Sequence, residues 1–281
     1  MAAELSLRPA PTRAAQAPPP AAPPAAPEAP EVAPPDRDAL RTQVEPEAPA
    51  APLAKLLFRV PCGWEGCFER CRAELLYVQE RLRATRYLPD FEDIFRVFDF
   101  VRPAEIRVVI VGQDPYPGLD YGGRPVATGV PFAVRRGTPV TASLRNIYAD
   151  MAQTVPGFVA PNHGDLTRWM RQGVFLLNSH LTTPASGASS LRGAEKHAFW
   201  AGVVVAVVEC IQEASPNAVF VLWGEDAKDI KKSRVLRNTI VCFEACHPSG
   251  RNGARFVGMG TLQAVNEEFE KRKEPLIDWR L

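Results

Sequence analysis

The stretch from Ile106 to Gly118 constrains the fold of this chain more than any other. It opens as a nearly unbroken run of β-branched residues, which is the pattern of a strand buried on both faces of a parallel sheet. The run stops at GQDPYPG, residues 112–118, where two prolines prevent a strand or a helix from continuing. The sequence therefore predicts a rigid loop at the carboxyl end of a buried strand, where α/β sheets bind ligands. A turn whose aspartate only caps a helix is the alternative.

Three further apolar runs have the length of buried strands. They cover Val174 to Leu177, Ala218 to Trp223 and Thr239 to Glu244. Strands that alternate with helices favour a parallel sheet with helices on both faces. We therefore expect an α/β fold with a central four-stranded, mostly parallel sheet that is flanked by helices on both faces.

The segments between and around these runs have apolar residues at helical spacing. Ser143 is the expected N-cap of the helix that starts there, and its position makes it a candidate phosphate contact. The other predicted helices cover Glu65 to Tyr87, Asp90 to Phe98, Asp165 to Gln172, Ala194 to Glu213, Asp226 to Leu236 and Gly260 to Arg272.

Residues 1–54 differ in composition from the rest of the chain. They hold half of the 28 prolines, and their four basic and seven acidic residues give a net charge of −3. The remaining 227 residues hold 29 basic and 25 acidic side chains, a net charge of +4, which is compatible with nucleic-acid binding without requiring it. A Pro- and Ala-rich segment has few large side chains to bury. We therefore expect a disordered tail over residues 1–54 and a single domain over residues 55–281.

The cysteines and apolar runs bear on the compartment and on metals. No secretory pattern opens the chain, so reduced thiols and an intracellular protein are expected. The spacing of Cys62, Cys67 and Cys71 does not match the tight pairs of common zinc sites, and we expect no metal. The longest apolar run, Ala198 to Cys210, is too short to span a bilayer, so no membrane association is expected.

Each predicted strand ends at a polar residue or a glycine. Parallel strands place these ends on one edge of the sheet, so the groups should converge on one site. The four residues are Asp114, Asn178, Gly224 and His247.

Such a site suits a planar, polar and uncharged ring. The carboxamide of Asn178 matches the hydrogen-bonding edge of a pyrimidine, and Phe132 could stack on the ring. Asp114 could orient water, while a neutral His247 could donate a hydrogen bond to a departing oxyanion. Because no cofactor motif is present, hydrolysis of a base–sugar bond fits better than redox or phosphoryl transfer. Asn178 as a turn former, His247 as a loop residue and Phe132 as a core residue remain the alternatives.

Six short motifs carry a resemblance to a known family. GQDPY, GVPFAV, VFLLNSHLT, VFVLWG, HPS and PLIDW follow the order and spacing of the uracil-DNA glycosylases, over roughly residues 85 to 281. The chain resembles the poxvirus branch most, because it reads DPYP and GVPF and carries the segment Lys196 to Trp200. The resemblance implies a cofactor-free hydrolase that flips uracil out of DNA and cleaves its N-glycosidic bond in base excision repair.

The resemblance also implies roles for individual residues. As catalytic residues, Asp114 would activate the water and His247 would steady the leaving uracil anion. The implied uracil-binding residues are Gln113, Tyr116, Phe132 and Asn178. The implied DNA-binding residues are Ser143, Ser249 and Arg251.

Three positions depart from the cellular members of the family. Pro117 stands where they have a loop histidine, and Gly250-Arg251 stands where they have an apolar wedge, for which Arg251 is the candidate substitute. Glu225 stands where a serine would touch DNA, and a carboxylate there would repel phosphate. We therefore expect weaker DNA engagement than in a cellular enzyme.

The poxvirus resemblance implies a second role. Poxvirus relatives act as a subunit of the DNA polymerase processivity factor, which here would place a viral partner protein near Ile230 to Ile240 and the protein in the host cytoplasm. Val235 and Leu236 would be exposed for docking or, equally well, buried in the core. A non-catalytic scaffold that bridges DNA and polymerase is the alternative function. A nucleotide-binding protein is disfavoured because no phosphate loop follows a strand.

Overall fold

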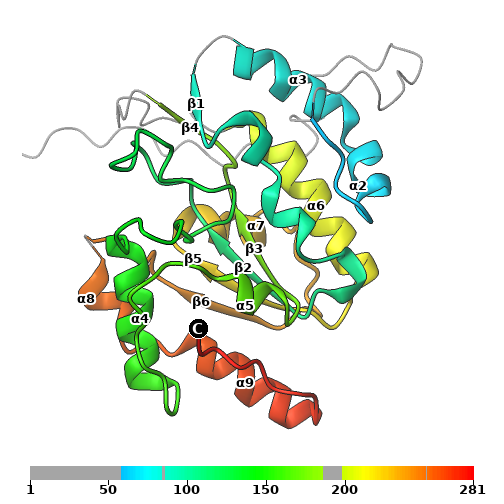
Figure 1. Ribbon diagram of the computed structural model, residues 1–281. Coiled ribbons are helices and arrows are strands. Elements are labelled where there is room, and N and C mark those ends of the chain that lie inside the picture. The colour runs from blue at the N-terminus through cyan, green and yellow to red at the C-terminus, as the bar shows by residue number, and fades with distance from the viewer. Residues whose placement is uncertain (1–57, 84–85, 186–197, 251) are drawn as a thin grey trace, which may run out of the picture. The chain divides into compact units, whose positions relative to one another are not determined.

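The computed structural model describes residues 58–83, 86–185, 198–250 and 252–281 of the chain (Figure 1). The predicted tail over residues 1–54 lies outside the described residues, and so does Arg251. In the described ranges, no helix is long and apolar enough to cross a membrane.

Four parallel strands form the central sheet, in the order β3-β2-β5-β6. Every residue of β2, β3 and β5 is buried, as their apolar runs predict, whereas the edge strand β6 is partly exposed. The predicted four-stranded sheet is confirmed, and all its strand pairs are parallel. The strands are β2 (Val108–Gly112), β3 (Val174–Asn178), β5 (Val219–Trp223) and β6 (Cys242–Ala245).

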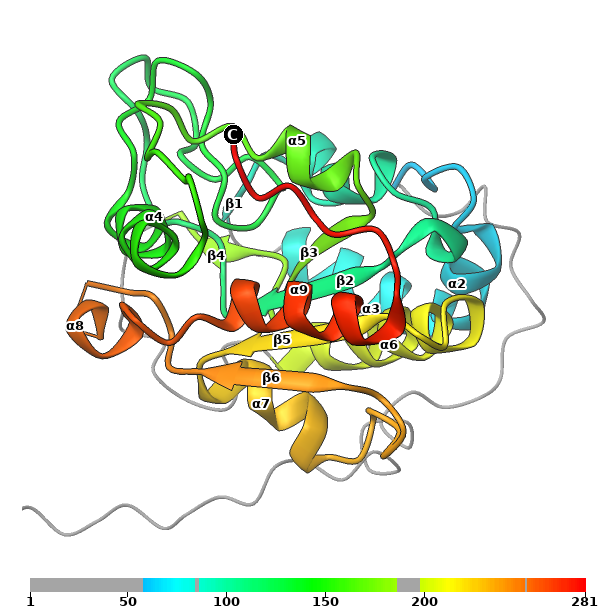
Figure 2. The same ribbon diagram turned by 90° about the horizontal axis from the view of Figure 1, so that it is seen from below.

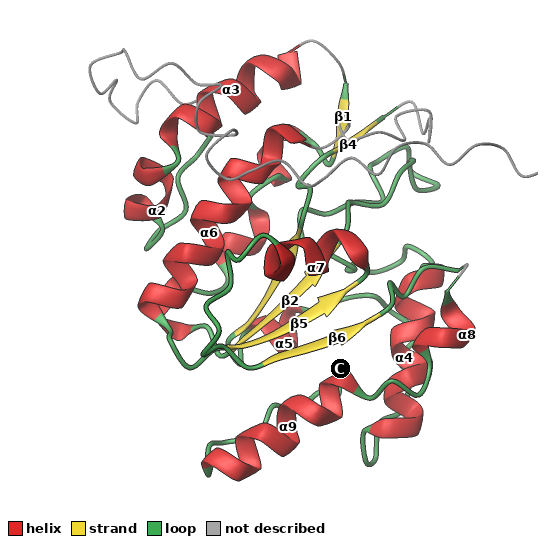
Figure 3. Ribbon diagram, turned by 180° about the vertical axis from the view of Figure 1, so that it is seen from behind, coloured by secondary structure: helices red, strands yellow, loops and turns green. Residues whose placement is uncertain are grey.

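Helices cover both faces of this sheet. Helix α9 and the C-terminal segment lie across the face turned to the viewer in Figure 2, and α4 packs against α9 there. Helix α7 crosses β2 and β5 on the opposite face in Figure 3, where α6 packs against α2 and α3. The helices are α2 (Glu65–Arg70), α3 (Arg72–Arg83), α4 (Ala142–Thr154), α5 (Thr167–Met170), α6 (Ala201–Ala214), α7 (Glu225–Lys232), α8 (Gly253–Phe256) and α9 (Thr261–Arg272).

The N-terminal helical region is more broken than predicted. The expected helix from Glu65 to Tyr87 is interrupted at Cys71, whose backbone leaves the helical region (φ −108°, ψ 29°). The expected helix from Asp90 to Phe98 is instead two short 3₁₀ turns, Phe91–Asp93 and Arg96–Asp99. The tight turns let buried aromatic side chains of this segment, such as Phe95 and Phe98, contact one another edge to face.

Two other features differ from the sequence-based expectation. The N-cap of α4 is Thr141 and not Ser143, because the Thr141 hydroxyl accepts a hydrogen bond from the Leu144 amide at 3.4 Å. A two-stranded antiparallel ribbon joins β1 (Tyr87–Leu88) to β4 (Thr183–Pro184). Strands of two residues are too short to produce a hydropathy pattern.

The segment after α7 is part of the core. Val235 and Leu236 are each 6% exposed, so of the two alternatives the core position is correct, and these side chains are not available for docking. The backbone amides of both residues donate to the carbonyl of Ile230, which turns the chain back under α7. The Gln212 side chain of α6 holds this turn by donating to the Val235 carbonyl at 3.0 Å.

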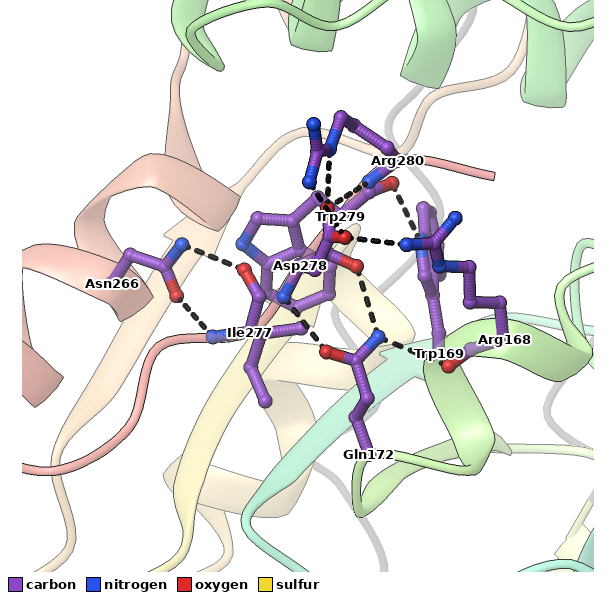
Figure 4. A network of polar contacts seen from close by, with 8 residues as sticks. All are labelled: Arg168, Trp169, Gln172, Asn266, Ile277, Asp278, Trp279 and Arg280. Atoms are coloured by element: carbon purple, nitrogen blue, oxygen red, sulfur yellow. Dashed lines mark hydrogen bonds and ion pairs between the residues drawn. The ribbon is translucent and has the colours of Figure 1, made fainter.

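The C-terminal segment is held by two side-chain amides (Figure 4). Asn266 donates to the Ile277 carbonyl and accepts from the Ile277 amide, each at 2.9 Å. Gln172 does the same with Asp278, at 2.9 Å and 2.8 Å. Each amide thus satisfies both backbone groups of one residue, as a neighbouring strand would. The clamp joins α9 to the turn that precedes β3.

The six cysteines are free thiols. In the part of the chain that the structure describes, no group of three histidine, cysteine or carboxylate side chains could hold a metal ion.

Candidate active site

A cavity of about 210 Å³ lies at the carboxyl edge of the sheet, beside the loops that follow β2, β3 and β6. It is smaller than the roughly 300–1,000 Å³ of sites for drug-sized ligands, so it suits a single small ring. Eight of the nine predicted site residues line it, and the ninth, Arg251, lies outside the described residues. The eight are Gln113, Asp114, Tyr116, Phe132, Ser143, Asn178, His247 and Ser249.

Gly112 lets an aromatic ring and a carboxamide meet in this cavity. A Cβ atom on Gly112 would lie 2.5 Å from Cζ of Phe132 and 2.8 Å from Oδ1 of Asn178. Asn178 is 6% exposed, and its amide makes no hydrogen bond to any described residue. A buried amide is normally satisfied, so donors and an acceptor left open beside a cavity indicate ligand recognition.

The Phe132 ring is fixed by a strained backbone. Its φ of +64° is unusual for a bulky residue, and such strain is retained where the surroundings enforce it. The Tyr116 hydroxyl donates to the Phe132 carbonyl at 2.9 Å, and it accepts from the Thr141 hydroxyl at 2.7 Å. Burial raises the pKa of the Tyr116 phenol, which therefore stays protonated as a donor. Trp223 packs edge to face on the Phe132 ring, with centroids 5.2 Å apart.

The His247 ring is neutral and has one defined tautomer. Burial lowers its pKa from 6.5 to about 4. The Ser249 amide donates to its Nδ1 atom at 3.2 Å, so Nδ1 is an acceptor and the proton is on Nε2. His247 therefore brings a neutral N–H donor to a cavity that it lines.

A polar residue of α4 holds the loop that carries this histidine. The Asn146 side chain donates to the Pro248 carbonyl at 2.9 Å and to the Ser249 carbonyl at 3.5 Å. Gly253 leaves room for it, because the three atoms nearest to a Cβ on Gly253 all belong to Asn146, the closest at 2.4 Å. Sequence reasoning missed Asn146 and Thr141. Their only signal was their position near Ser143 on a helix predicted to border the site.

The electrostatics of the cavity disfavour an anionic ligand. Among the described residues that line the cavity, Asp114 is the only carboxylate, and none is a lysine or an arginine. This carboxylate would repel a charged phosphate in the cavity. The cavity therefore suits a neutral, polar ring, and serine hydroxyls from Ser143 and Ser249 complete its lining.

The carboxylate of Glu225, which stands where a serine would touch DNA, is paired with cations. Its side chain is 70% exposed and pairs with Lys228 at 2.9 Å and Lys232 at 3.1 Å. Hydrogen bonds to Lys228 and Lys232 lower the pKa of Glu225. The carboxylate also lies in the first turn of α7, where the helix dipole favours a negative charge.

Comparisons with known proteins agree with this geometry. The model of the uracil DNA glycosylase superfamily matches residues 98–270. A uracil-DNA glycosylase of Deinococcus radiodurans is 38% identical over 203 residues, which is 72% of this chain and 78% of the relative. One of Deinococcus deserti is 35% identical over 84% of this chain and 94% of the relative. The crystal structure of mimivirus uracil-DNA glycosylase has a TM-score of 0.69 and 27% identity, covering 83% of this chain and 90% of its own.

The family match covers the strands and loops that build the cavity, from the GQDPYPG loop to the His247 loop. Both bacterial relatives exceed a third in identity over most of their own length. The family match, the identity to the two relatives and the shared fold show that this chain belongs to the uracil-DNA glycosylase superfamily.

Proposed function

We propose that this uracil-DNA glycosylase binds an extruded deoxyuridine in the cavity and hydrolyses its N-glycosidic bond with Asp114 and His247 as catalytic residues. Uracil excision in base excision repair is the activity of the family. Gln113, Tyr116, Phe132 and Asn178 would bind the base, while Ser143, Ser249 and Arg251 would contact the DNA.

The observation that carries the proposal is the open amide of Asn178. Asn178 is 6% exposed, and its amide, which lies next to the Phe132 ring, makes no hydrogen bond to a described residue. A flipped pyrimidine would satisfy the amide through its Watson–Crick edge while its face lies on the phenyl ring. Tyr116 is held in the wall by two hydrogen bonds, so it would resist displacement by a thymine methyl group.

The geometry supports a simple hydrolytic step. The bond between C1′ of the sugar and N1 of uracil breaks, and its electron pair passes to the base as an anion. The Nε2–H group of His247 would donate to this anion, which is electrostatic stabilisation of developing charge. The Asp114 carboxylate would stabilise the positive sugar, orient water for attack on C1′ and accept the proton of that water. Release of that proton from Asp114 and protonation of the uracil anion by solvent give the products, uracil and an abasic site.

The decisive experiment is release of uracil by the purified chain. A single-stranded and a double-stranded oligonucleotide with one uracil are incubated with the protein in EDTA, and alkaline cleavage reveals abasic sites. We expect cleavage of both substrates at uracil, with none when thymine or cytosine replaces it. Absence of cleavage would contradict the proposed function and favour the scaffold alternative. Activity that EDTA removes would contradict the metal-free mechanism.

The low pKa of His247 predicts an unusual dependence of stability on pH. The unfolded state binds a proton near pH 6.5 and the folded state only near pH 4, so the unfolded state holds more protons between these values. The contribution of His247 to the free energy of unfolding is therefore constant well above pH 6.5, and it falls as the pH drops toward 4. At pH 5.5 the loss is about 1 kcal/mol. Chemical denaturation at pH 7.5 and 5.5 measures it, and His247→Gln should lack this component. Equal pH dependence in both proteins would contradict the prediction.

The contact between Asn146 and the His247 loop predicts a coupled pair of substitutions. Gly253→Ala should displace the Asn146 side chain, because no other residue lies as close to the new methyl group. The hydrogen bond from Asn146 to the His247 loop is then lost. If the full value of this bond, about 1 kcal/mol, is lost from the stabilisation of the transition state, kcat/KM for uracil release falls about fivefold.

The control is a double-mutant cycle. Asn146→Ala should cause a similar loss, and adding Gly253→Ala to it should cost nothing further. Gly66→Ala is the matched glycine control, since a Cβ on Gly66 meets nothing within 4 Å. Additive losses in the cycle would show that Gly253 acts independently of Asn146.

The assignment to the poxvirus branch, the processivity-factor role and a location in the host cytoplasm remain predictions. Burial of Val235 and Leu236 argues against these two side chains as docking residues. A viral partner would therefore need another surface of the segment Ile230 to Ile240, such as its polar side chains.

A further inference from the structure

A short hairpin lies between two residues of the cavity lining. The chain leaves the lining at Pro117 and returns to it at Ala127, and residues 118–126 between them form what we call the rim hairpin. Leu119 and Pro125 form an isolated antiparallel bridge, and the Val126 amide donates to the Gly118 carbonyl at 3.1 Å. Because both ends are anchored in the cavity lining, the hairpin is placed at the mouth of the site.

The rim hairpin is rigid for its size. The Asp120 side chain is 5% exposed and accepts hydrogen bonds from the Gly122 amide at 2.8 Å and the Arg124 amide at 3.0 Å. The Asp120 amide donates to the Arg124 carbonyl at 2.7 Å. From outside, the Arg135 guanidinium donates to the Pro125 carbonyl at 2.6 Å. A binding surface that is already ordered loses little conformational entropy when it engages a ligand.

This rigid support presents an aromatic side chain to solvent. Tyr121 is 96% exposed, more than any other large hydrophobic residue among those described, and Leu119 in the same hairpin is 52% exposed. The Tyr121 ring contacts no described aromatic residue, and its hydroxyl makes no hydrogen bond within the described chain. The side chain therefore makes no visible contribution to the fold, although the hydrogen bonds of the hairpin hold its backbone in place.

The charges of the hairpin point to stacking and not to phosphate binding. Asp120 and Arg124 form an ion pair at 3.1 Å, so the hairpin carries no net charge. A neutral element with an exposed ring matches the face of a nucleobase, because every base can stack on an aromatic side chain. A base can do so only when it has left its own stack, as in single-stranded DNA or next to a flipped nucleotide.

We propose that Tyr121 is a stacking platform for an unpaired nucleobase adjacent to the deoxyuridine, and that the rim hairpin thereby favours single-stranded DNA. This inference rests on the proposed function, since it concerns the DNA that enters the same cavity. Stacking of one base should change the affinity for single-stranded DNA about 5- to 150-fold.

Binding to a single-stranded oligonucleotide with an abasic site tests the proposal. We expect Tyr121→Ala to weaken the affinity, and Tyr121→Phe and Tyr121→Trp to retain it, because stacking needs the ring and not the hydroxyl. The slope of log Kd against log salt should be the same in all variants, since no phosphate contact is lost. Tyr77→Ala is the matched control: Tyr77 is a 47% exposed tyrosine on α3 that does not line the cavity.

A second measurement separates this proposal from the proposed function. The ratio of kcat/KM on a uracil oligonucleotide to kcat/KM on a uracil nucleotide without neighbouring bases should fall in Tyr121→Ala and stay constant in Tyr77→Ala. If Tyr121→Ala changed neither the affinity for single-stranded DNA nor the ratio of kcat/KM values, the inference would be overturned, and the Tyr121 ring would not contact a base. Equal losses in the Ala and Phe variants would overturn stacking in favour of a hydroxyl contact. Inactivity of the wild-type chain on both substrates would instead contradict the proposed function, while the affinity measurement still decides the role of Tyr121.

Discussion

Asp114→Asn should lower the rate of uracil release by about 10²- to 10⁴-fold, the range for loss of a general base. The amide has the shape of the carboxylate but lacks its charge, so it can neither accept a proton from water nor stabilise a cationic sugar. Asp114 is also the only carboxylate among the described lining residues, so no other described side chain there can take over its role. Single-turnover formation of abasic sites measures the rate.

Binding must be measured in the same variant. Removal of one negative charge from a DNA-binding site should leave the affinity for DNA unchanged or slightly higher. Asp229→Asn, an exposed aspartate of α7, is the matched control and should behave as the wild type. If the Asn variant retained activity within about tenfold, Asp114 would not be the base. If the wild-type rate were as low as that of the variant, the chain would be a DNA-binding scaffold.

Gly112→Ala should close the base pocket. The new methyl carbon would lie 2.5 Å from Phe132 and 2.8 Å from Asn178. Neither can retreat easily, because the Phe132 backbone is fixed at a positive φ and Asn178 is paired with Gly112 in the sheet. Overpacking of this kind lowers the free energy of unfolding by about 1–3 kcal/mol. Displacement of the base by about 1 Å should lower kcat/KM about 100-fold or more.

Inhibition by free uracil distinguishes pocket closure from general damage. We expect Gly112→Ala to lose this inhibition while it keeps the wild-type affinity for DNA with an abasic site. Gly66→Ala, whose methyl group meets nothing within 4 Å, should match the wild type in all measurements. A folded Gly112→Ala protein with normal inhibition by uracil would show that the base lies elsewhere.

The sheet and the convergence of its loops could be predicted because both depend on local patterns. Unbroken runs such as Val108–Gly112 specify buried strands, and parallel pairing then brings Asp114, Asn178 and His247 to one edge. No detailed contact was needed for this conclusion. The roles of these residues in catalysis remain predictions that the experiments above test.

The residues that hold the site in position could not be predicted, because they act through contacts between segments that are distant in sequence. Asn146 acts on a loop about a hundred residues away in sequence, and nothing in its own neighbourhood indicates this contact. The positive φ of Phe132 also leaves no signal in the sequence, because a phenylalanine with a strained backbone cannot be told from any other core phenylalanine by its sequence context. The turn at Val235 is held by the Gln212 side chain of α6, which donates to the Val235 carbonyl, and the pattern of residues around Val235 does not reveal this contact.

The strand order has a consequence for how the enzyme matures. Gly112 ends the first and central strand of the sheet, whereas His247 follows the last strand, at its edge. The cavity, which His247 and Ser249 also line, is therefore complete only after nearly the whole chain has been synthesised and β6 has paired. A ligand that recognises only the finished pocket stabilises the native state by mass action. Free uracil, the product of the reaction, should thus act as a pharmacological chaperone during refolding.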